Sequence, residues 1–149
     1  MEYPKKVSNV RIVYEPEVLP EERYVVNSSE DATRIAVGNW DGIYHHESFR
    51  IMLLDAARQV LGIQTVSTGG VTSTLVDVKI CIQAAVLGNA TSVIAMHNHP
   101  SGMMRPSESD ETLTARLKRA FESVDISMLD HVIVGGRGEY YSFADNEKL

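Results

Sequence analysis

The chain has 149 residues and a formal net charge of −6, with 14 Lys and Arg against 20 Asp and Glu. This length suits one domain with a proper core, and a hydrophobic content of 44% is ordinary for a globular protein. The single Cys excludes an internal disulfide and a multi-cysteine zinc site, so a reducing, cytoplasmic setting is expected. The acidic balance argues against strong autonomous nucleic-acid binding, which needs a basic surface.

The hydropathy of the chain predicts no contact with a membrane. Its longest apolar stretches fall short of the roughly 18 to 20 residues that a membrane span needs, and residues 1–6 start no signal-peptide core. We therefore expect a cytoplasmic protein.

The first elements in the chain are a short strand and a helix. Alternating apolar residues predict an edge strand within residues 7–18. Ser28 and Asp31 have capping-box spacing and are followed by apolar residues at helical spacing, which predicts a helix over residues 29–38. The alternating positions of the expected strand are Val10, Ile12 and Tyr14.

The middle of the chain predicts a hairpin and a buried helix. Residues 47–54 alternate between two faces, and residues 60–67 follow a turn at 55–58 as the partner strand. Apolar residues then surround a helix near residues 78–87, which Gly88 ends, so we expect this helix to be largely buried.

The last elements are a central strand, an amphipathic helix and a hairpin. The apolar run 91–96 predicts a strand buried on both sides, and Ser107 opens a helix that ends near Val124. Residues 128–134 and 139–143 form a hairpin around a glycine-rich turn. The expected fold class is α/β (α+β), a single mixed sheet of five or six strands with packed helices.

The residues with the clearest chemistry follow the central strand. His97 and His99 are two positions apart at its end, so both imidazoles point to one side. A loop with two prolines and a glycine reverses the chain, and Asp110 on the first turn of the next helix returns a carboxylate to the same place. Two His and one carboxylate are a ligand set of catalytic zinc that leaves a position open for water.

An alternative interpretation of these residues is purely structural. Ser107 and Asp110 have the spacing of an ordinary capping box, and an Asp in a first helical turn is favoured by the helix dipole. A lone His at a strand end is usually a satisfied polar residue. Two same-face His, a turn and a returning Asp together favour the metal site.

The same residues carry a family resemblance. His97-x-His99, seven further residues and Ser107-x-x-Asp110 resemble the JAMM motif of the JAB/MPN metalloproteases. The flanking segments resemble the RadC family over roughly residues 28–145, which implies the cytidine-deaminase-like architecture of JAB/MPN domains. These segments are HNHPSG (97–102), PSESD (106–110), LDHVIVGGRGEYYSF (129–143) and ESFRIMLLD (47–55).

The resemblance also sets the expected domain organisation. Residues 28–149 are expected to be a RadC-like JAB/MPN domain, and residues 1–27 an N-terminal extension. Full-length RadC proteins carry a helix-hairpin-helix region ahead of this domain, for which residues 1–27 are too short. We therefore expect a short form without that region.

The resemblance implies a role for each site residue. His97, His99 and Asp110 would hold one zinc ion per chain, Ser107 would stabilise an oxyanion or the water, and Glu47 would be the general acid and base. The sequence supports the role of Glu47, because it lies in phase with the apolar face of its strand, and burial raises the proton affinity of a carboxylate. The alternative is a charge at the strand edge that faces solvent.

The implied function is zinc-dependent hydrolysis, of the peptidase or isopeptidase type, by a metal-activated water. Its substrate would be a peptide or an isopeptide-linked protein, and Cys81 has no role in it. The family name also implies DNA repair, so the alternative function is a non-catalytic, metal-containing binding module that acts with DNA-processing partners. A zinc deaminase needs further Cys ligands, and a two-metal nuclease needs more carboxylates. The sequence indicates no oligomeric state.

Further polar residues receive weaker predictions. His45 and His46 are expected to be a solvated pair rather than the rim of the site. His131, in a predicted strand, is expected to make a structural hydrogen bond, with a role behind a metal ligand as the alternative. Asp77 is expected to cap a helix, and residues 72–74 to border the substrate channel.

Overall fold

The structure, a computed structural model, describes residues 7–11, 13, 15–69 and 75–149. Its centre is one mixed sheet of five strands in the order β2-β1-β3-β4-β5, in which β3 and β4 are parallel and the other neighbours are antiparallel. This sheet confirms the α/β class expected from the sequence. The strands are β1 (Ser48–Leu54), β2 (Val60–Thr68), β3 (Ser92–Asn98), β4 (Ser127–Val134) and β5 (Tyr140–Ser142); the helices are α1 (Ser29–Gly38), α2 (Val78–Leu87) and α3 (Glu108–Glu122).

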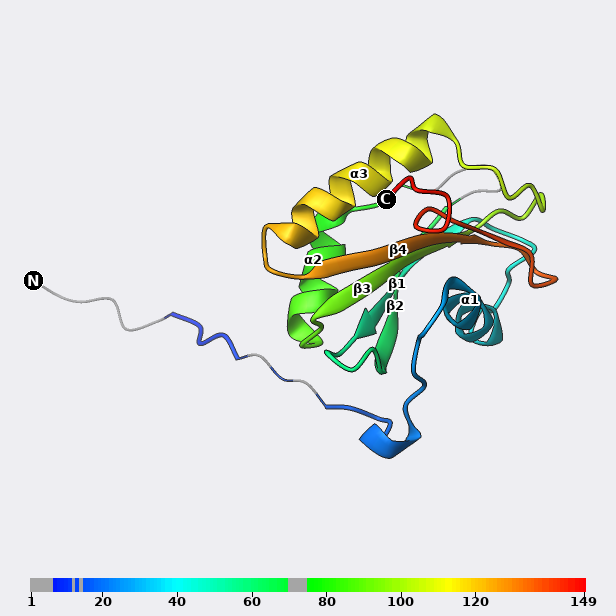
Figure 1. Cartoon of the computed structure of the whole chain (residues 1–149). Helices are drawn as coiled ribbons and strands as arrows, with labels where there is room; N and C mark the ends of the chain where they lie inside the picture. The colour runs from blue at the N-terminus through cyan, green and yellow to red at the C-terminus, as the bar shows by residue number, and fades with distance from the viewer. Residues whose placement is uncertain (1–6, 12, 14, 70–74) are drawn as a thin grey trace, which may run out of the picture.

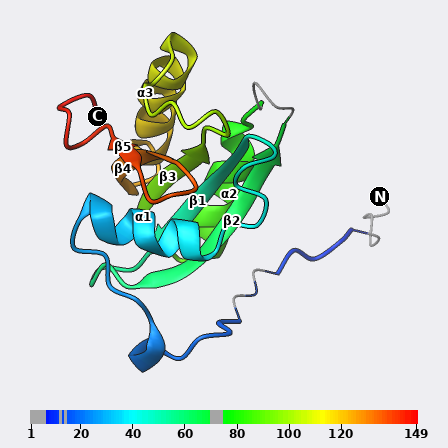
Figure 2. The ribbon, with the colours of Figure 1, turned by 90° about the vertical axis from the view of Figure 1, so that its right-hand side faces the viewer.

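Helices cover both faces of the sheet, because successive side chains of the inner strands point to opposite sides. Phe49, Ile51 and Leu53 of β1 pack in one core cluster with α2 and α3, whereas Met52 and Leu54 pack in a second cluster with α1. Figures 1 and 2 show α2 and α3 on one face and α1 on the other. The α3 helix connects the two parallel strands, so its first turn returns to the end of β3.

The edge strand expected within residues 7–18 is wrong for the part of this segment that the structure describes, and Ile12 and Tyr14 lie outside that part. Figure 1 shows the described residues of this segment extending away from the sheet, with no strand of the sheet beside them. Pairing starts only near Val25, which forms an isolated antiparallel bridge with Gln59. The alternating pattern alone was not sufficient, because a strand also needs a partner.

The α2 helix is less buried than the sequence predicted. Cys81 and Ala85 are fully buried, but the side chains of Ile80, Val86 and Leu87 are 38%, 45% and 44% exposed. The helix contacts β1, β2 and α3 along one side only, and its apolar residues on the other side remain open to solvent. The presence of apolar residues on every side of α2 therefore did not predict that every side is buried.

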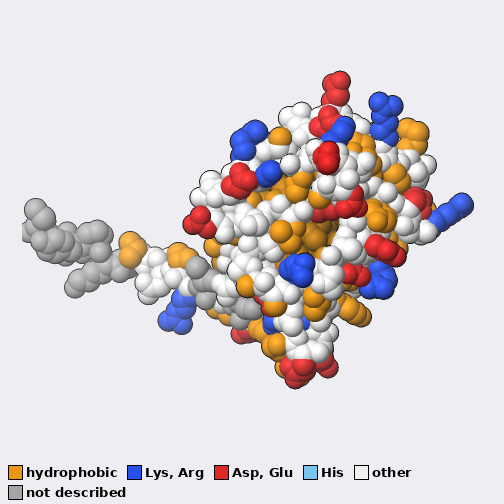
Figure 3. All heavy atoms as spheres, viewed as in Figure 1, with side chains coloured by type: hydrophobic (Ala, Val, Ile, Leu, Met, Phe, Trp, Pro, Cys, Tyr) orange, Lys and Arg blue, Asp and Glu red, His pale blue; other side chains and the backbone are white. Residues whose placement is uncertain are grey.

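Two further observations concern the outside of the molecule. Within the described ranges, each helix is too short or too polar to cross a bilayer. On the face drawn in Figure 3, acidic and basic side chains are interspersed around hydrophobic ones.

Candidate metal centre and active site

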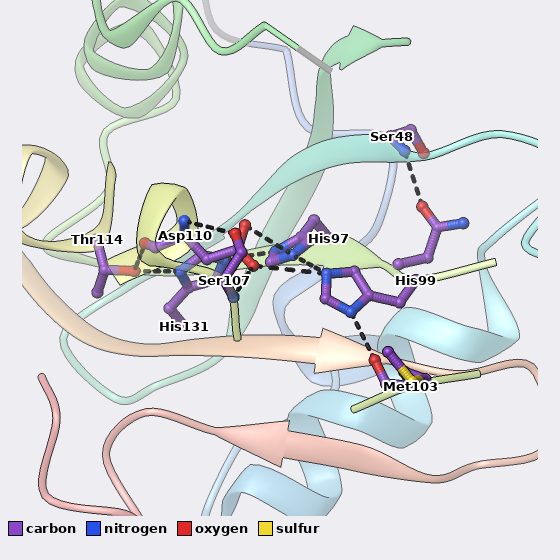
Figure 4. Close-up of polar contacts among 9 residues, drawn as sticks. Ser48, His97, His99, Met103, Ser107, Asp110, Thr114 and His131 are labelled. Carbon is purple, nitrogen blue, oxygen red and sulfur yellow. Dashed lines mark hydrogen bonds and ion pairs between the residues drawn. The ribbon is translucent and has the colours of Figure 1, made fainter. Parts of the chain in front are cut away.

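The end of β3 places two imidazoles on the α3 side of the sheet. His97 lies opposite Phe49 of β1 and is almost completely buried. His99 follows the last residue of the strand, and its backbone N–H still donates to the carbonyl of Val134 at 3.3 Å. The Nε2 atoms of the two His are 2.9 Å apart, so the predicted same-side arrangement is present (Figure 4).

Asp110 returns to this point from the first turn of α3. The loop before the helix reverses at Gly102, whose φ of +77° suits glycine and whose N–H donates to the His99 carbonyl. One carboxylate oxygen, Oδ1, lies 3.3 Å from Nε2 of His97, and the other, Oδ2, lies 3.6 Å from Nε2 of His99. The loop and the helix together bring a carboxylate to two imidazoles.

The capping box and the candidate metal site share the same carboxylate. Ser107 is the N-cap of α3, and its Oγ accepts the Asp110 N–H at 3.1 Å, while Oδ2 of Asp110 accepts the Ser107 N–H at 2.7 Å. The sequence presented cap and ligand as alternatives. In the structure Asp110 holds both positions at once, because a carboxylate has two oxygens with several lone pairs.

Glu47 reaches the centre from the residue before β1. Its backbone carbonyl accepts the N–H of Gly69, and its side chain is half-buried in phase with the strand, as the sequence indicated. One potential ligand atom from each of four residues lies within 4.8 Å of the others, and these residues line a cavity of about 460 Å³. The four residues are Glu47, His97, His99 and Asp110.

Asn98, between the two His, points to the opposite side of β3 and holds the segment that carries Glu47. Its Oδ1 accepts the Ser48 N–H at 2.8 Å. Its Nδ2 donates to the carbonyls of Ile43 at 2.7 Å and His46 at 2.8 Å. The peptide groups on both sides of Glu47 are therefore fixed by one buried amide.

Burial and hydrogen bonds shift the pKa values of the acidic and basic groups. Burial raises the pKa of Asp110, but its contacts with His97 and His99 outweigh burial and hold it well below the usual range. Burial lowers the pKa of His99, but hydrogen bonds to Asp110 and the Met103 carbonyl raise it overall. The pKa of Glu47 is raised, mainly by burial. A carboxylate of raised pKa suits proton transfer near neutral pH.

The donor set fits a metal ion. Nδ1 of His99 lies 2.6 Å from the Met103 carbonyl, which can only accept, so Nδ1 carries a proton and Nε2 of the neutral ring has a lone pair. That lone pair faces two carboxylates, which also only accept when ionised. Atoms bound tetrahedrally to zinc at about 2.0–2.1 Å are about 3.3 Å apart. The observed separations of 2.9, 3.3 and 3.6 Å lie around that value.

His131 and Thr114 lie directly behind His97. Nε2 of His131 is 2.8 Å from Nδ1 of His97, and Nδ1 of His131 is 2.6 Å from Oγ1 of Thr114 (Figure 4). Burial of the whole ring holds the pKa of His131 well below its ordinary value. The hydrogen bonds expected of His131 are present, and one of them goes to a candidate metal ligand.

The other polar residues have simpler positions. His45 and His46 are exposed, as expected of a solvated pair. Asp77 accepts the Lys79 N–H and caps α2. Residues 72–74, expected along a substrate channel, lie outside the described residues.

Sequence reasoning missed Asn98 and Thr114. The signal for Asn98 was a polar residue within a strand that is otherwise buried on both sides, where an amide needs partners. Thr114 gave no distinct signal, because it follows Asp110 by four residues in a polar part of α3 and its contact with His131 depends on the packing of α3 against β4.

The fold and the site together define the class of the protein, an α/β domain with a candidate metal centre. The end of β3, the first turn of α3 and the residue before β1 contribute to this centre. The model of the RadC-like JAB domain matches residues 26–149, so the chain belongs to this family. The family implies a fold of the metal-dependent hydrolase type, consistent with the His, Asp and Glu group of this structure.

Curated relatives share this resemblance. The UPF0758 protein YkfG of Escherichia coli K12 is 44% identical over 103 residues, which are 69% of this chain and 65% of that protein. A UPF0758 protein of Dechloromonas aromatica is 45% identical over 104 residues, 70% of this chain and 46% of that protein. A third, from Flavobacterium johnsoniae, is 37% identical over 120 residues, 80% of this chain and 52% of that protein. The chain thus matches between 46% and 65% of the length of these relatives.

Proposed function

We propose that this protein is a zinc-dependent hydrolase that cleaves amide bonds, of the peptidase or isopeptidase type. The observation that carries the proposal is the meeting of two imidazoles and two carboxylates at one point of an open cavity. Membership in the RadC-like JAB family supports a hydrolase-type metal centre.

The ligand set favours zinc. His97 and His99 offer imidazole nitrogens, and Asp110 offers a carboxylate oxygen, which is a three-residue set typical of catalytic zinc with a fourth position for water or substrate. When bound, such an ion supplies an acidified water molecule and polarises a carbonyl oxygen.

Glu47 and Ser107 have positions that suit proton transfer and oxyanion stabilisation. The carboxylate of Glu47 faces the ligand group, and its raised pKa lets it accept a proton from a nucleophilic water and pass it to the leaving amine. The Oγ of Ser107 accepts a helix N–H, so its own proton is free to donate to an oxygen in the cavity.

The walls of the cavity suit an extended peptide. Apolar side chains of Val76, Met103 and Leu113 lie beside the polar group, and Arg105 adds one positive charge. Apolar walls around a few convergent polar groups are typical of ligand sites. We expect a peptide backbone to lie along this groove with its scissile carbonyl above the ligand group.

A paired-variant experiment tests the proposal. Protein purified without chelator is analysed for bound metal, and its hydrolysis of a fluorogenic peptide library and of isopeptide-linked conjugates is measured. Glu47→Gln should retain about one zinc per chain and lose at least about 100-fold in rate, the usual size of a general acid–base contribution. Glu122→Gln, an exposed Glu at the end of α3, is the matched control and should retain full activity.

Two results would contradict the proposal. Failure of the purified protein to bind zinc, even after reconstitution, removes the metal centre. Zinc binding without hydrolysis of any tested amide, together with full biological function of Glu47→Gln, instead supports a non-catalytic binding module.

A further inference from the structure

We propose that Thr114 and His131 are positioning residues that fix the tautomer of His97, so that its Nε2 lone pair faces the metal position. The inference rests on the proposed metal centre and deepens it. It follows from a chain of hydrogen bonds that starts at a backbone carbonyl, where the direction of donation is certain.

The first step is the hydroxyl of Thr114. Its Oγ1 lies 2.6 Å from the backbone carbonyl of Asp110, one turn earlier in α3. A carbonyl oxygen only accepts hydrogen bonds, so the hydroxyl proton of Thr114 points to it. A hydroxyl has one proton, and Oγ1 is therefore an acceptor towards any other partner.

The second step is the ring of His131. Nδ1 of His131 lies 2.6 Å from Oγ1 of Thr114, and because Oγ1 accepts here, Nδ1 carries a proton. The ring is fully buried and neutral, so its other nitrogen, Nε2, has a lone pair. Thr114 thus determines which tautomer His131 adopts.

The third step is His97. Its Nδ1 lies 2.8 Å from Nε2 of His131, which accepts, so Nδ1 of His97 carries the proton. In the neutral ring Nε2 is then the lone pair, and this atom faces Asp110 and His99. The chain of bonds begins at the Asp110 carbonyl and ends at a nitrogen 3.3 Å from the Asp110 carboxylate.

Aromatic packing holds His131, the middle residue of this series of hydrogen bonds, in place. The ring of His131 is stacked on Phe143, with centroids 4.8 Å apart and planes inclined by 8°. Phe49 meets the same ring edge-on, with centroids 5.6 Å apart. Because His131 is held on two sides, it cannot turn to offer its other nitrogen without disturbing the core.

The zinc affinity of variants measures the effect of this series of hydrogen bonds. Loss of a hydrogen-bond partner behind a metal-binding His typically weakens metal binding by about 10- to 100-fold. Thr114→Val removes the hydroxyl with little change of shape and should show this loss, whereas Thr114→Ser restores the hydroxyl and should recover most of the affinity. Thr33→Val is the matched control, since Thr33 is also a buried helical Thr and its Oγ1 has no hydrogen-bond partner among the residues that the structure describes.

The experiment uses the full chain and two readouts besides activity. Zinc dissociation constants come from competition with a chromophoric chelator, with urea unfolding to verify the fold of each variant. The visible absorption spectrum of the cobalt-substituted protein reports ligand geometry and should change in Thr114→Val only. Long-range proton–nitrogen NMR of the metal-free, unmutated protein reads the tautomers directly, and His97 and His131 should both be protonated on Nδ1.

The outcomes separate this inference from the proposed function. Equal zinc affinity of Thr114→Val and the unmutated protein overturns the inference and leaves the metal centre in place. Equal weakness of Thr114→Ser and Thr114→Val, or a proton on Nε2 of His131, overturns it as well. Absence of zinc binding by the unmutated protein overturns both.

Discussion

Replacement of Asn98 by Ala should separate the position of the general base from the binding of metal. The Asn98 side chain satisfies three backbone groups of the segment before β1: the N–H of Ser48 and the carbonyls of Ile43 and His46. Ala cannot replace any of these hydrogen bonds. The segment that carries Glu47 then loses its attachment to β3.

The cost follows from the burial of these groups. Ser48 is 5% exposed, so its unpaired N–H costs about 1–3 kcal/mol. The Ile43 carbonyl belongs to a buried residue, so its loss of the amide also costs about 1–3 kcal/mol, whereas His46 is exposed and water can replace the amide at its carbonyl, at about 0.5–1.5 kcal/mol. The free energy of unfolding should therefore fall by about 2.5–7.5 kcal/mol, a large share of the usual stability of a domain.

The effect on hydrolysis should exceed the effect on zinc affinity. Asn98 holds the peptide groups on both sides of Glu47, whereas the hydrogen bonds of its side chain within the described residues go to Ser48, Ile43 and His46 and to none of the three proposed ligands. Urea unfolding gives the change in stability, chelator competition the zinc affinity, and single-turnover hydrolysis the rate. Asn98→Asp retains the acceptor for Ser48 and loses both donors, and Asn9→Ala in the exposed N-terminal segment is the control.

Two results would refute this reasoning. A loss of stability below about 1 kcal/mol for Asn98→Ala would mean that the three hydrogen bonds contribute less than one buried bond normally does. A zinc affinity that falls in proportion to the rate would mean that Asn98 supports the ligands and not Glu47.

Two further predictions concern pH and the single cysteine. A protonated His cannot bind metal, and hydrogen bonds to Asp110 and the Met103 carbonyl raise the pKa of His99, so its proton competes with zinc at a higher pH than for a free His and zinc affinity should fall as the pH is lowered from 7 to 6, by at most about tenfold for each displaced proton. Asp110, whose pKa is lowered, stays ionised and adds nothing; chelator competition at both pH values measures the change, and a flat profile would contradict it. Burial raises the pKa of Cys81 to about 12, so iodoacetamide at pH 8 should leave the native thiol unmodified and alkylate it fully in urea. Rapid alkylation of the native protein would show that α2 is not packed as described.

The sequence predicted the elements whose side chains follow a clear period. The alternation of Phe49, Ile51 and Leu53 with Met52 and Leu54 assigned the two faces of β1 correctly, because both faces are buried and each side chain has a core to enter. The position of α2 was predicted correctly, but the edge strand within residues 7–18 and the burial of most of α2 were wrong, because both depend on neighbouring elements. A periodic pattern describes one element and does not say what covers it.

For the candidate site too, the sequence predicted the features that follow from spacing within one element and missed the contacts between elements. The spacing of His97 and His99 on a strand placed both rings on one side, and the structure brings Asp110 and Glu47 to them. The contacts of Asn98 and Thr114 were not predictable, since they join residues from different elements. Spacing alone could not separate a capping role of Asp110 from a ligand role, because the same carboxylate caps α3 and lies beside both His of the candidate metal group.

The alternation along the end of β3 makes correct strand pairing a condition for any site at all. His97 serves the ligand group on one face, and Asn98 serves the segment of Glu47 on the other. A shift of β3 by one residue against β1 would exchange the two faces, so His97 and Asn98 would both lose these contacts. A molecule with β3 out of register would bring neither His97 to the candidate ligand group nor Asn98 to the segment of Glu47. Metal binding would therefore indicate that β3 is paired in the correct register.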